Sequence, residues 1–132
     1  MTAPTPVDLL AGLTLLVVDD NDDAAEVLST FLRSCGADVL CAQTAIGALT
    51  YVDASPSIDA VITDLAMPDM DGVELARRIR RHPSRTSVLP VIALTGFYEQ
   101  YLGNQDFDAF LKKPVNLDDL CGTIAALARR RE

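Results

Sequence analysis

The sequence lacks the residue patterns on which several common classes of protein depend. Its three cysteines, Cys35, Cys41 and Cys121, are an odd number without CxxC spacing, so neither a disulfide nor a zinc site is predicted and small apolar core roles are expected. Histidine occurs once, at His82, which gives little basis for a phosphohistidine donor in this chain. The apolar run from Leu9 to Val18 is too short to cross a bilayer, and no basic segment precedes it. We therefore expect a cytoplasmic protein without membrane spans.

Positive charge is also scarce. Lys and Arg number 11 against 19 Asp and Glu, which gives a formal net charge of -8. A surface of this kind is poorly suited to neutralise phosphates, so nucleic acid and anionic membranes are not expected as partners. The basic run RRIRRH, Arg77 to His82, lies at the expected end of a helix, where cations complement the helix dipole. A cation is the more natural ligand for this chain.

No internal repeat, low-complexity tract or change of composition divides the chain. Its 132 residues, of which 49% are hydrophobic, fit one domain with a proper core. Residues 1–12, which include Pro4 and Pro6, are expected to form a loosely held N-terminal tail, and residues 13–132 the domain. Within that domain short apolar runs alternate with helical patterns, which is the main indication of the fold.

Five apolar runs are predicted to be strands, and their Val, Ile and Leu content without strict polar alternation is typical of parallel strands buried on both faces. They are Leu13–Val18, Asp38–Ala42, Ala60–Thr63, Val91–Leu94 and Ala109–Leu111. The first predicted helix has an apolar stripe, a cap at Asn21 and an end at Gly36. The stripe consists of Ala24, Val27, Leu28, Phe31 and Cys35. Three further helices are expected: one from Thr44 to Val52, one with Val73, Ala76 and Ile79, and one from Asn116 with Leu117, Leu120, Ile124 and Leu127.

This alternation predicts an α/β doubly wound parallel sheet with right-handed crossovers and helices on both faces. Sheets of this class bind ligands at the carboxyl ends of their strands. Acids stand at those ends here, because Asp19 and Asp20 follow LLVV and Asp64 follows AVIT. If the first and third strands are neighbours, as in the flavodoxin-like order, the three carboxylates converge and oppose folding unless a cation joins them. Mg²⁺, with Mn²⁺ as an alternative, suits such oxygen ligands and often binds phosphate as well.

Two more functional groups follow later strands. Thr95 ends the fourth strand in ALTG, and Lys113 follows the fifth in FLKKP. A carboxylate that attacks phosphorus, beside a metal, an ammonium and a hydroxyl donor that neutralise the transferring oxygens, is a machinery for phosphoryl transfer. Asp64 would be the nucleophile and would form a covalent aspartyl phosphate.

The motifs VVDDN, ITDLAMPDMDG, ALTG and FLKKP, in this order, resemble the receiver domain of two-component response regulators, and the match runs from Leu13 to about Leu127. The resemblance implies a flavodoxin-like (βα)5 sheet with strand order 2-1-3-4-5. It implies Asp64 as the phosphoacceptor and a metal ligand, Asp20 as a direct Mg²⁺ ligand, Asp19 as a ligand through water, and the backbone carbonyl of Ala66 as a further ligand.

The same resemblance implies roles for residues around the acids. Lys113 would pair with the phosphoryl group and precede a cis peptide bond to Pro114, which X-Pro bonds tolerate. Thr95 would be the switch residue, and Phe110 the aromatic that rotates with it; simple core packing is the other interpretation of Phe110. Ala66 and Phe97 occupy positions that tune loss of the phosphoryl group, and neither side chain can orient a water. Slow self-dephosphorylation is therefore expected.

The sequence departs from the family pattern between Thr95 and Lys113. Their separation of 18 positions is about one helical turn shorter than usual, so the fourth helix, over FYEQYLGNQD, is expected to be short or irregular. The surface around this helix commonly dimerises in receivers, and the usual dimer is therefore in doubt, although a homodimer remains among the arrangements considered.

The function implied is a phosphorylation-dependent signalling switch in a two-component phosphorelay. Its donor would be the phosphohistidine of a histidine kinase or histidine phosphotransfer protein, and its target an unknown protein. It would catalyse only its own phosphorylation and dephosphorylation, and so would not be an enzyme. The alternative is a receiver-like docking domain that needs no phosphorylation, but the acids, threonine and lysine that such domains often lose are all present. A Mg²⁺-dependent phosphatase with an aspartyl nucleophile is a second alternative, but such enzymes usually carry another acid two residues after the nucleophile, where this sequence has Ala66. Both a stand-alone receiver and a receiver from a hybrid histidine kinase fit the sequence.

Overall fold

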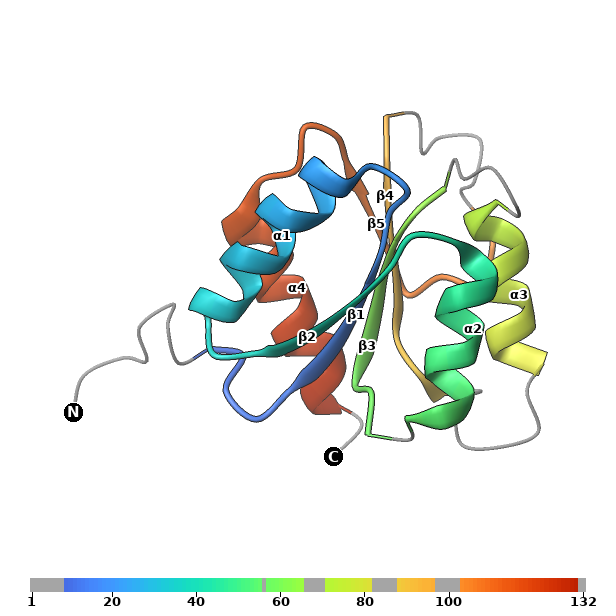
Figure 1. Ribbon diagram of the computed structural model, residues 1–132, viewed down its shortest axis with the longest axis horizontal. Coiled ribbons are helices and arrows are strands. Elements are labelled where there is room, and N and C mark those ends of the chain that lie inside the picture. Colours follow the sequence, from blue (N-terminus) through green and yellow to red (C-terminus); the bar gives the residue numbers. More distant parts are fainter. Residues whose placement is uncertain (1–8, 56, 66–70, 82–87, 97–102, 131–132) are drawn as a thin grey trace.

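The computed structural model describes residues 9–55, 57–65, 71–81, 88–96 and 103–130. Within these residues five parallel strands form one sheet in the order β2-β1-β3-β4-β5, and four helices cover it (Figure 1). The strands are β1 Thr14–Val18, β2 Asp38–Ala42, β3 Ala60–Asp64, β4 Val91–Thr95 and β5 Ala109–Lys112. The helices are α1 Asp22–Ser34, α2 Ala45–Ala54, α3 Gly72–Arg81 and α4 Leu117–Arg130. The predicted flavodoxin-like sheet and its strand order are confirmed.

The helices lie in two layers, with α1 and α4 on one face of the sheet and α2 and α3 on the other (Figure 1). Side chains of the central strands alternate between the two faces. Leu15 and Val17 of β1 join the apolar cluster beneath α1 and α4, and Leu16 and Val18 join the cluster beneath α2 and α3. The uninterrupted apolar runs of the sequence are thus explained by strands that are buried on both faces.

Helix α1 begins and ends as predicted, but its buried face differs. Asn21 caps the helix by accepting the Ala24 N–H at 2.9 Å, and Gly36 follows its end with a φ of 100°. Val27 of the predicted stripe is 64% exposed, and Ala24 is exposed as well. The buried positions are Ala25, Leu28, Ser29 and Leu32. Apolar residues occupy two neighbouring faces of this helix, and packing on β1 and β2 uses only one of them.

The other helices lie where predicted, with small shifts. Thr44 caps α2 by accepting the Gly47 N–H at 3.0 Å. On α3 the buried side chains include Leu75, which the predicted face omitted, and on α4 Leu117 is only partly buried. The fourth helix expected between β4 and β5 falls mostly on residues 97–102, which lie outside the described residues; the described part, residues 103–108, forms turns.

Two sequence expectations need correction. Leu10, placed in the loose tail, is fully buried and its N–H bonds the Cys35 carbonyl at 2.9 Å, so the folded unit includes residues before 13. Arg129 of α4 also holds this segment, by donating to the Leu9 carbonyl at 3.0 Å. Cys41, expected in the core, is exposed because it lies on the edge strand β2. None of the described helices has the length and apolar composition that a bilayer span requires.

Candidate functional site: the acidic edge of the sheet

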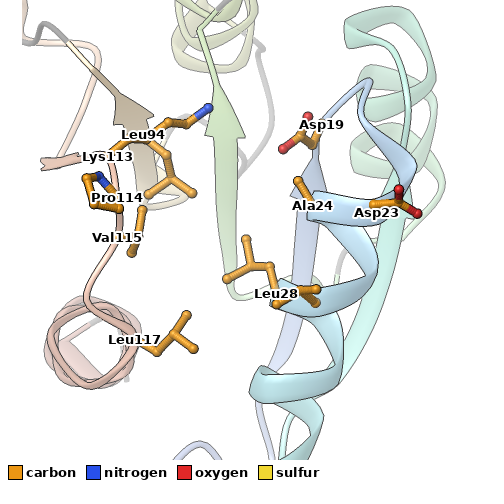
Figure 2. Close-up of a pocket in the computed structure, with 10 residues that line it drawn as sticks. Asp19, Asp23, Ala24, Leu28, Leu94, Lys113, Pro114, Val115 and Leu117 are labelled. Carbon is orange, nitrogen blue, oxygen red and sulfur yellow. The ribbon is translucent and has the colours of Figure 1, made fainter.

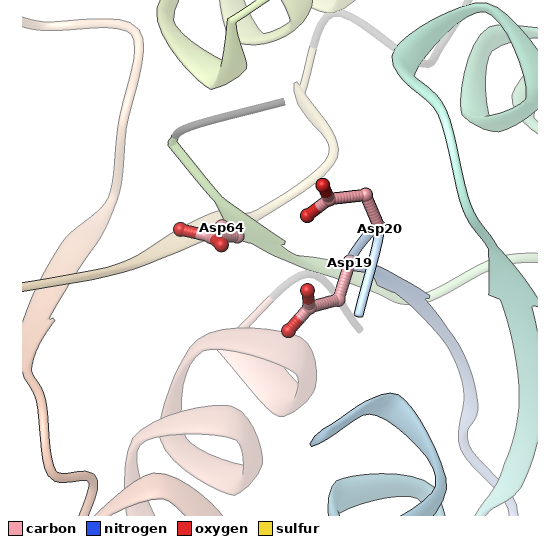
Figure 3. A group of neighbouring side chains, drawn as sticks. All are labelled: Asp19, Asp20 and Asp64. Atoms are coloured by element: carbon pink, nitrogen blue, oxygen red, sulfur yellow. The ribbon is translucent and has the colours of Figure 1, made fainter. Parts of the chain in front are cut away.

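The acids meet where β1 and β3 end side by side. These strands are hydrogen-bonded neighbours with Val18 opposite Thr63, so Asp19 and Asp20 leave β1 beside Asp64, the last residue of β3. One carboxylate oxygen from each acid lies within 4.8 Å of the other two, and Figure 3 shows the three side chains around one space. The sheet topology therefore brings together the three acids that the sequence singled out.

Asp19 is held firmly and is the most buried of the three. Its backbone N–H bonds the Ala42 carbonyl at 3.0 Å, and its Oδ1 accepts the Asn21 N–H at 2.9 Å. Burial raises the pKa of Asp19, and the nearby charges of Asp64 and Asp20 raise it further, while the Asn21 N–H and Lys113 oppose the rise. The ionised cluster is thus unfavourable by itself, which favours a bound cation.

Lys113 supplies positive charge at the same edge. The Lys113 Nζ lies 3.3 Å from Asp64 Oδ1. The backbone N–H of Lys113 donates a hydrogen bond to the Thr95 carbonyl at 2.9 Å, which connects the end of β5 to the end of β4. The Lys113–Pro114 peptide bond is cis, the conformation that the resemblance implies. With 42% of its side chain exposed, the ammonium can also reach a group that enters from solvent.

The expected switch residues lie on the two strands next to the acids. Thr95 ends β4, and Phe110 lies in β5 with its ring centroid 5.0 Å from that of the buried Phe107. A Cβ built on Gly96 would meet no atom within 4 Å, so the space beside Thr95 is open. Two tuning positions, Ala66 and Phe97, lie outside the described residues, and their roles stay predictions.

A cavity of about 440 Å³ opens beside the acids, between the start of α1 and the loop that leads into α4 (Figure 2). Asp19 and Lys113 stand at one end of it, and apolar side chains form most of its wall. Val27, whose exposure was not expected, belongs to this wall. This cavity could not be predicted from the sequence, because it forms only when the fold places α1 and the loop at Pro114 on the same face of the sheet.

Sequence reasoning also missed the close packing that fixes the segment after Asp64. Gly72, the first residue of α3, donates its N–H to the Leu65 carbonyl at 2.9 Å. A Cβ at this position would lie only 2.6 Å from the Asp64 carbonyl oxygen. The Asp-Gly pair in PDMDG was the available signal, since glycine permits such close approach.

The donor set fits Mg²⁺. Among the described residues it consists of carboxylate oxygens, which a small hard cation prefers, and their mutual repulsion is what a divalent ion would relieve. Asp19, Asp20 and Asp64 would hold the ion, which would neutralise charge on transferring phosphoryl oxygens.

Comparison with known proteins agrees with this geometry. The sequence-family model that describes the response regulator receiver domain matches residues 15–125 of this chain. The chain belongs to that family. As a receiver domain it is a component of two-component signalling, and its strand order, acids and lysine occupy the places that the motifs predicted.

Three relatives place this receiver domain more closely. A putative response regulator from Chloroflexus aurantiacus has a TM-score of 0.81 at 33% identity, over 89% of this chain and 98% of that one. TrrA from Thermotoga maritima, solved in complex with Mg²⁺ and BeF, has a TM-score of 0.78 at 29% identity, over 87% of this chain and 98% of that one. Histidine kinase 3 from Arabidopsis thaliana is 42% identical over 136 residues. That alignment covers 86% of this receiver domain but 13% of the kinase, so the chain corresponds to a small part of it.

Proposed function

We propose that this receiver domain is a phosphorylation-dependent switch that accepts a phosphoryl group on Asp64 with the help of Mg²⁺. The observation that carries the proposal is the convergence of three acids within 4.8 Å with Lys113 Nζ 3.3 Å from Asp64 Oδ1. Carboxylates this close need a cation, and a lysine beside the nucleophile suits a substrate that brings negative charge. The Mg²⁺ and BeF bound by TrrA give independent support from a protein of the same fold.

In the proposed reaction a carboxylate oxygen of Asp64 forms a bond to phosphorus as the P–N bond of a phosphohistidine breaks. The electron pair of that bond stays on the leaving imidazole nitrogen. Lys113 would neutralise charge on the phosphoryl oxygens, with a further contribution from Mg²⁺ held by Asp19, Asp20 and Asp64. The Thr95 hydroxyl would donate a hydrogen bond to one of these oxygens. Rearrangement of Thr95 and Phe110 would then alter the surface near β4 and β5.

The proposed phosphoryl donor is a histidine kinase or a histidine phosphotransfer protein, and the likeness to the receiver part of histidine kinase 3 supports this class. The signal would leave through an unknown protein target or a homodimer, without direct contact to nucleic acid or membrane. The domain would turn over no other substrate, and a cytoplasmic location fits these partners. Phosphorylation-independent docking is the rival function.

The test is intact mass after incubation with a small phosphoryl donor such as acetyl phosphate, with and without Mg²⁺. We expect one added phosphate on the wild type in Mg²⁺, and none on Asp64→Asn or after chelation. Asp38→Asn is the matched control, because Asp38 is an exposed acid at the opposite edge of the sheet. Mg²⁺ binding and phosphorylation that are both absent from the wild type would favour the docking function instead.

A further inference from the structure

Thr63, the residue before the phosphoacceptor, is a polar side chain in an apolar place. It is 0% exposed. Val18 of β1 and Ala93 of β4, its partners in the neighbouring strands, both belong to the apolar cluster beneath α2 and α3. Val61 and Leu65, two residues before and after it, belong to the same cluster. A valine would fill such a position with apolar atoms alone, so packing does not explain the hydroxyl.

The hydroxyl makes one specific contact. Thr63 Oγ1 donates to the carbonyl oxygen of Asp64 at 2.7 Å. A buried hydroxyl is unfavourable unless it is hydrogen-bonded, and this one bonds the backbone of the residue that the proposed function makes the nucleophile. Its effect is therefore directed at the orientation of the peptide group between Asp64 and Leu65.

Gly72 contacts the same segment through its backbone. Its N–H bonds the Leu65 carbonyl at 2.9 Å, and its Cα packs so closely that a Cβ would lie 2.6 Å from the Asp64 oxygen. The backbone carbonyls of Asp64 and Leu65 thus each accept a hydrogen bond, the first from the Thr63 hydroxyl and the second from the Gly72 N–H. Because a peptide group is planar, the direction of the Asp64 carbonyl also sets the direction in which the chain continues.

We propose that Thr63 is a positioning residue for the metal and phosphoryl site. Its hydroxyl fixes the peptide group after Asp64, so that the Asp64 carboxylate meets Mg²⁺ without rearrangement. The inference rests on the proposed function, since it assigns Thr63 a role at the same Mg²⁺ site. Thr63 acts through the backbone and touches neither the metal nor the phosphoryl group.

The experiment compares two substitutions that separate the hydroxyl from the methyl group. Thr63→Val keeps the shape and removes the hydroxyl, whereas Thr63→Ser keeps the hydroxyl and removes the methyl. Mg²⁺ affinity is measured by isothermal titration calorimetry at constant ionic strength, and stability by urea unfolding without metal. Thr63→Ala is a second hydroxyl-free variant in case Thr63→Val does not fold.

We expect Thr63→Val and Thr63→Ala to bind Mg²⁺ about tenfold more weakly, and Thr63→Ser within about twofold of the wild type, because partners that orient metal ligands have effects of this size. The urea midpoint should move the other way, lower for Thr63→Ser and not lower for Thr63→Val. Wild-type Mg²⁺ affinity in Thr63→Val would overturn this inference and leave the proposed function standing. Absence of Mg²⁺ binding by the wild type would overturn both.

Discussion

At the scale of single residues, the site is a set of charges that the fold brings together at some cost. Asp19 is buried beside two other acids, and burial and those charges raise its pKa. The Asn21 N–H donates a hydrogen bond to the Asp19 carboxylate, and the positive charge of Lys113 offsets part of the negative charge of the cluster. These contacts only partly compensate for the repulsion among the three acids. Charged groups whose arrangement lowers the stability of the fold are typical of sites that bind a ligand of opposite charge.

Asp19→Asn should therefore stabilise the metal-free protein. An amide oxygen can still accept the Asn21 N–H, while the buried negative charge and its repulsion of Asp64 and Asp20 are removed. The urea midpoint without Mg²⁺ should rise, and saturating Mg²⁺ should stabilise the variant less than it stabilises the wild type. A metal-free midpoint below that of the wild type would contradict the account of the cluster.

The cysteines should differ in reactivity. Cys41 is exposed on β2, whereas burial and then a hydrogen bond with the Cys35 thiol raise the pKa of Cys121 to about 12. At pH 8 almost no Cys121 thiolate forms, and the thiolate is the reactive species. Iodoacetamide should label Cys41 in the folded protein and Cys121 only after unfolding, as measured by mass spectrometry of the peptides. Equal labelling rates for the two in the folded protein would be inconsistent with the structure.

At the scale of elements, the acidic edge depends on where α3 begins. Gly72 starts this helix against the end of β3, with contacts to the Asp64 and Leu65 carbonyls that leave no room for a side chain. The position of the helix and the direction of the phosphoacceptor segment are therefore coupled. A substitution at the start of α3 should therefore alter the position of Asp64.

Gly72→Ala should destabilise the protein by about 1–3 kcal/mol, as overpacking commonly does, and should weaken Mg²⁺ binding. The control is Gly122→Ala in α4, where a new Cβ meets nothing within 4 Å. Alanine in a helix interior should stabilise by about 0.5–1 kcal/mol relative to glycine. The urea midpoints of the two variants should thus shift in opposite directions. An unchanged midpoint for Gly72→Ala would show that the atoms around Gly72 move easily to make room for a Cβ.

Elements also mark what the sequence could and could not predict. Each strand was predicted to within one residue. The three central strands β1, β3 and β4 are buried on both faces and appear in the sequence as plain apolar runs. The buried face of α1 was predicted only in part: Leu28 and Cys35 are buried, but Ala24 and Val27 are exposed although they are as apolar as the residues that pack on the sheet. A role for Thr63 could not be predicted, because threonine is common in strands and the role depends on a hydrogen bond that no sequence pattern encodes.

At the scale of the whole molecule, the two edges of the sheet do different work. The carboxyl edge holds the acids and Lys113, and the other edge is tied together by Arg80 at the end of α3. Arg80 donates to the Asp106 carbonyl at 3.0 Å, to the Leu89 carbonyl, and to the Asp108 carboxylate. Asp108 in turn accepts the Val91 N–H at 2.8 Å. This network joins α3, the start of β4 and the connection into β5.

Arg80→Met should therefore lower stability without altering the site. The loss of hydrogen bonds from a largely buried guanidinium should cost about 2–4 kcal/mol in urea unfolding. Phosphorylation of the folded variant by acetyl phosphate should match the wild type, because Arg80 is at the far edge from Asp64. Arg81→Met, at an exposed position next along α3, should leave the unfolding midpoint almost unchanged. Equal stability losses in both variants would contradict a specific role of Arg80.

The most direct test of the central claim is to locate the phosphoryl group. After incubation with acetyl phosphate and Mg²⁺, borohydride reduces an aspartyl phosphate to homoserine, and peptide mass spectrometry then identifies the modified position. We predict homoserine at position 64, formed only when Mg²⁺ is present. Modification at another residue, or phosphorylation of the wild type that leaves Asp64 unreduced, would show that the acidic edge is not the phosphoacceptor site.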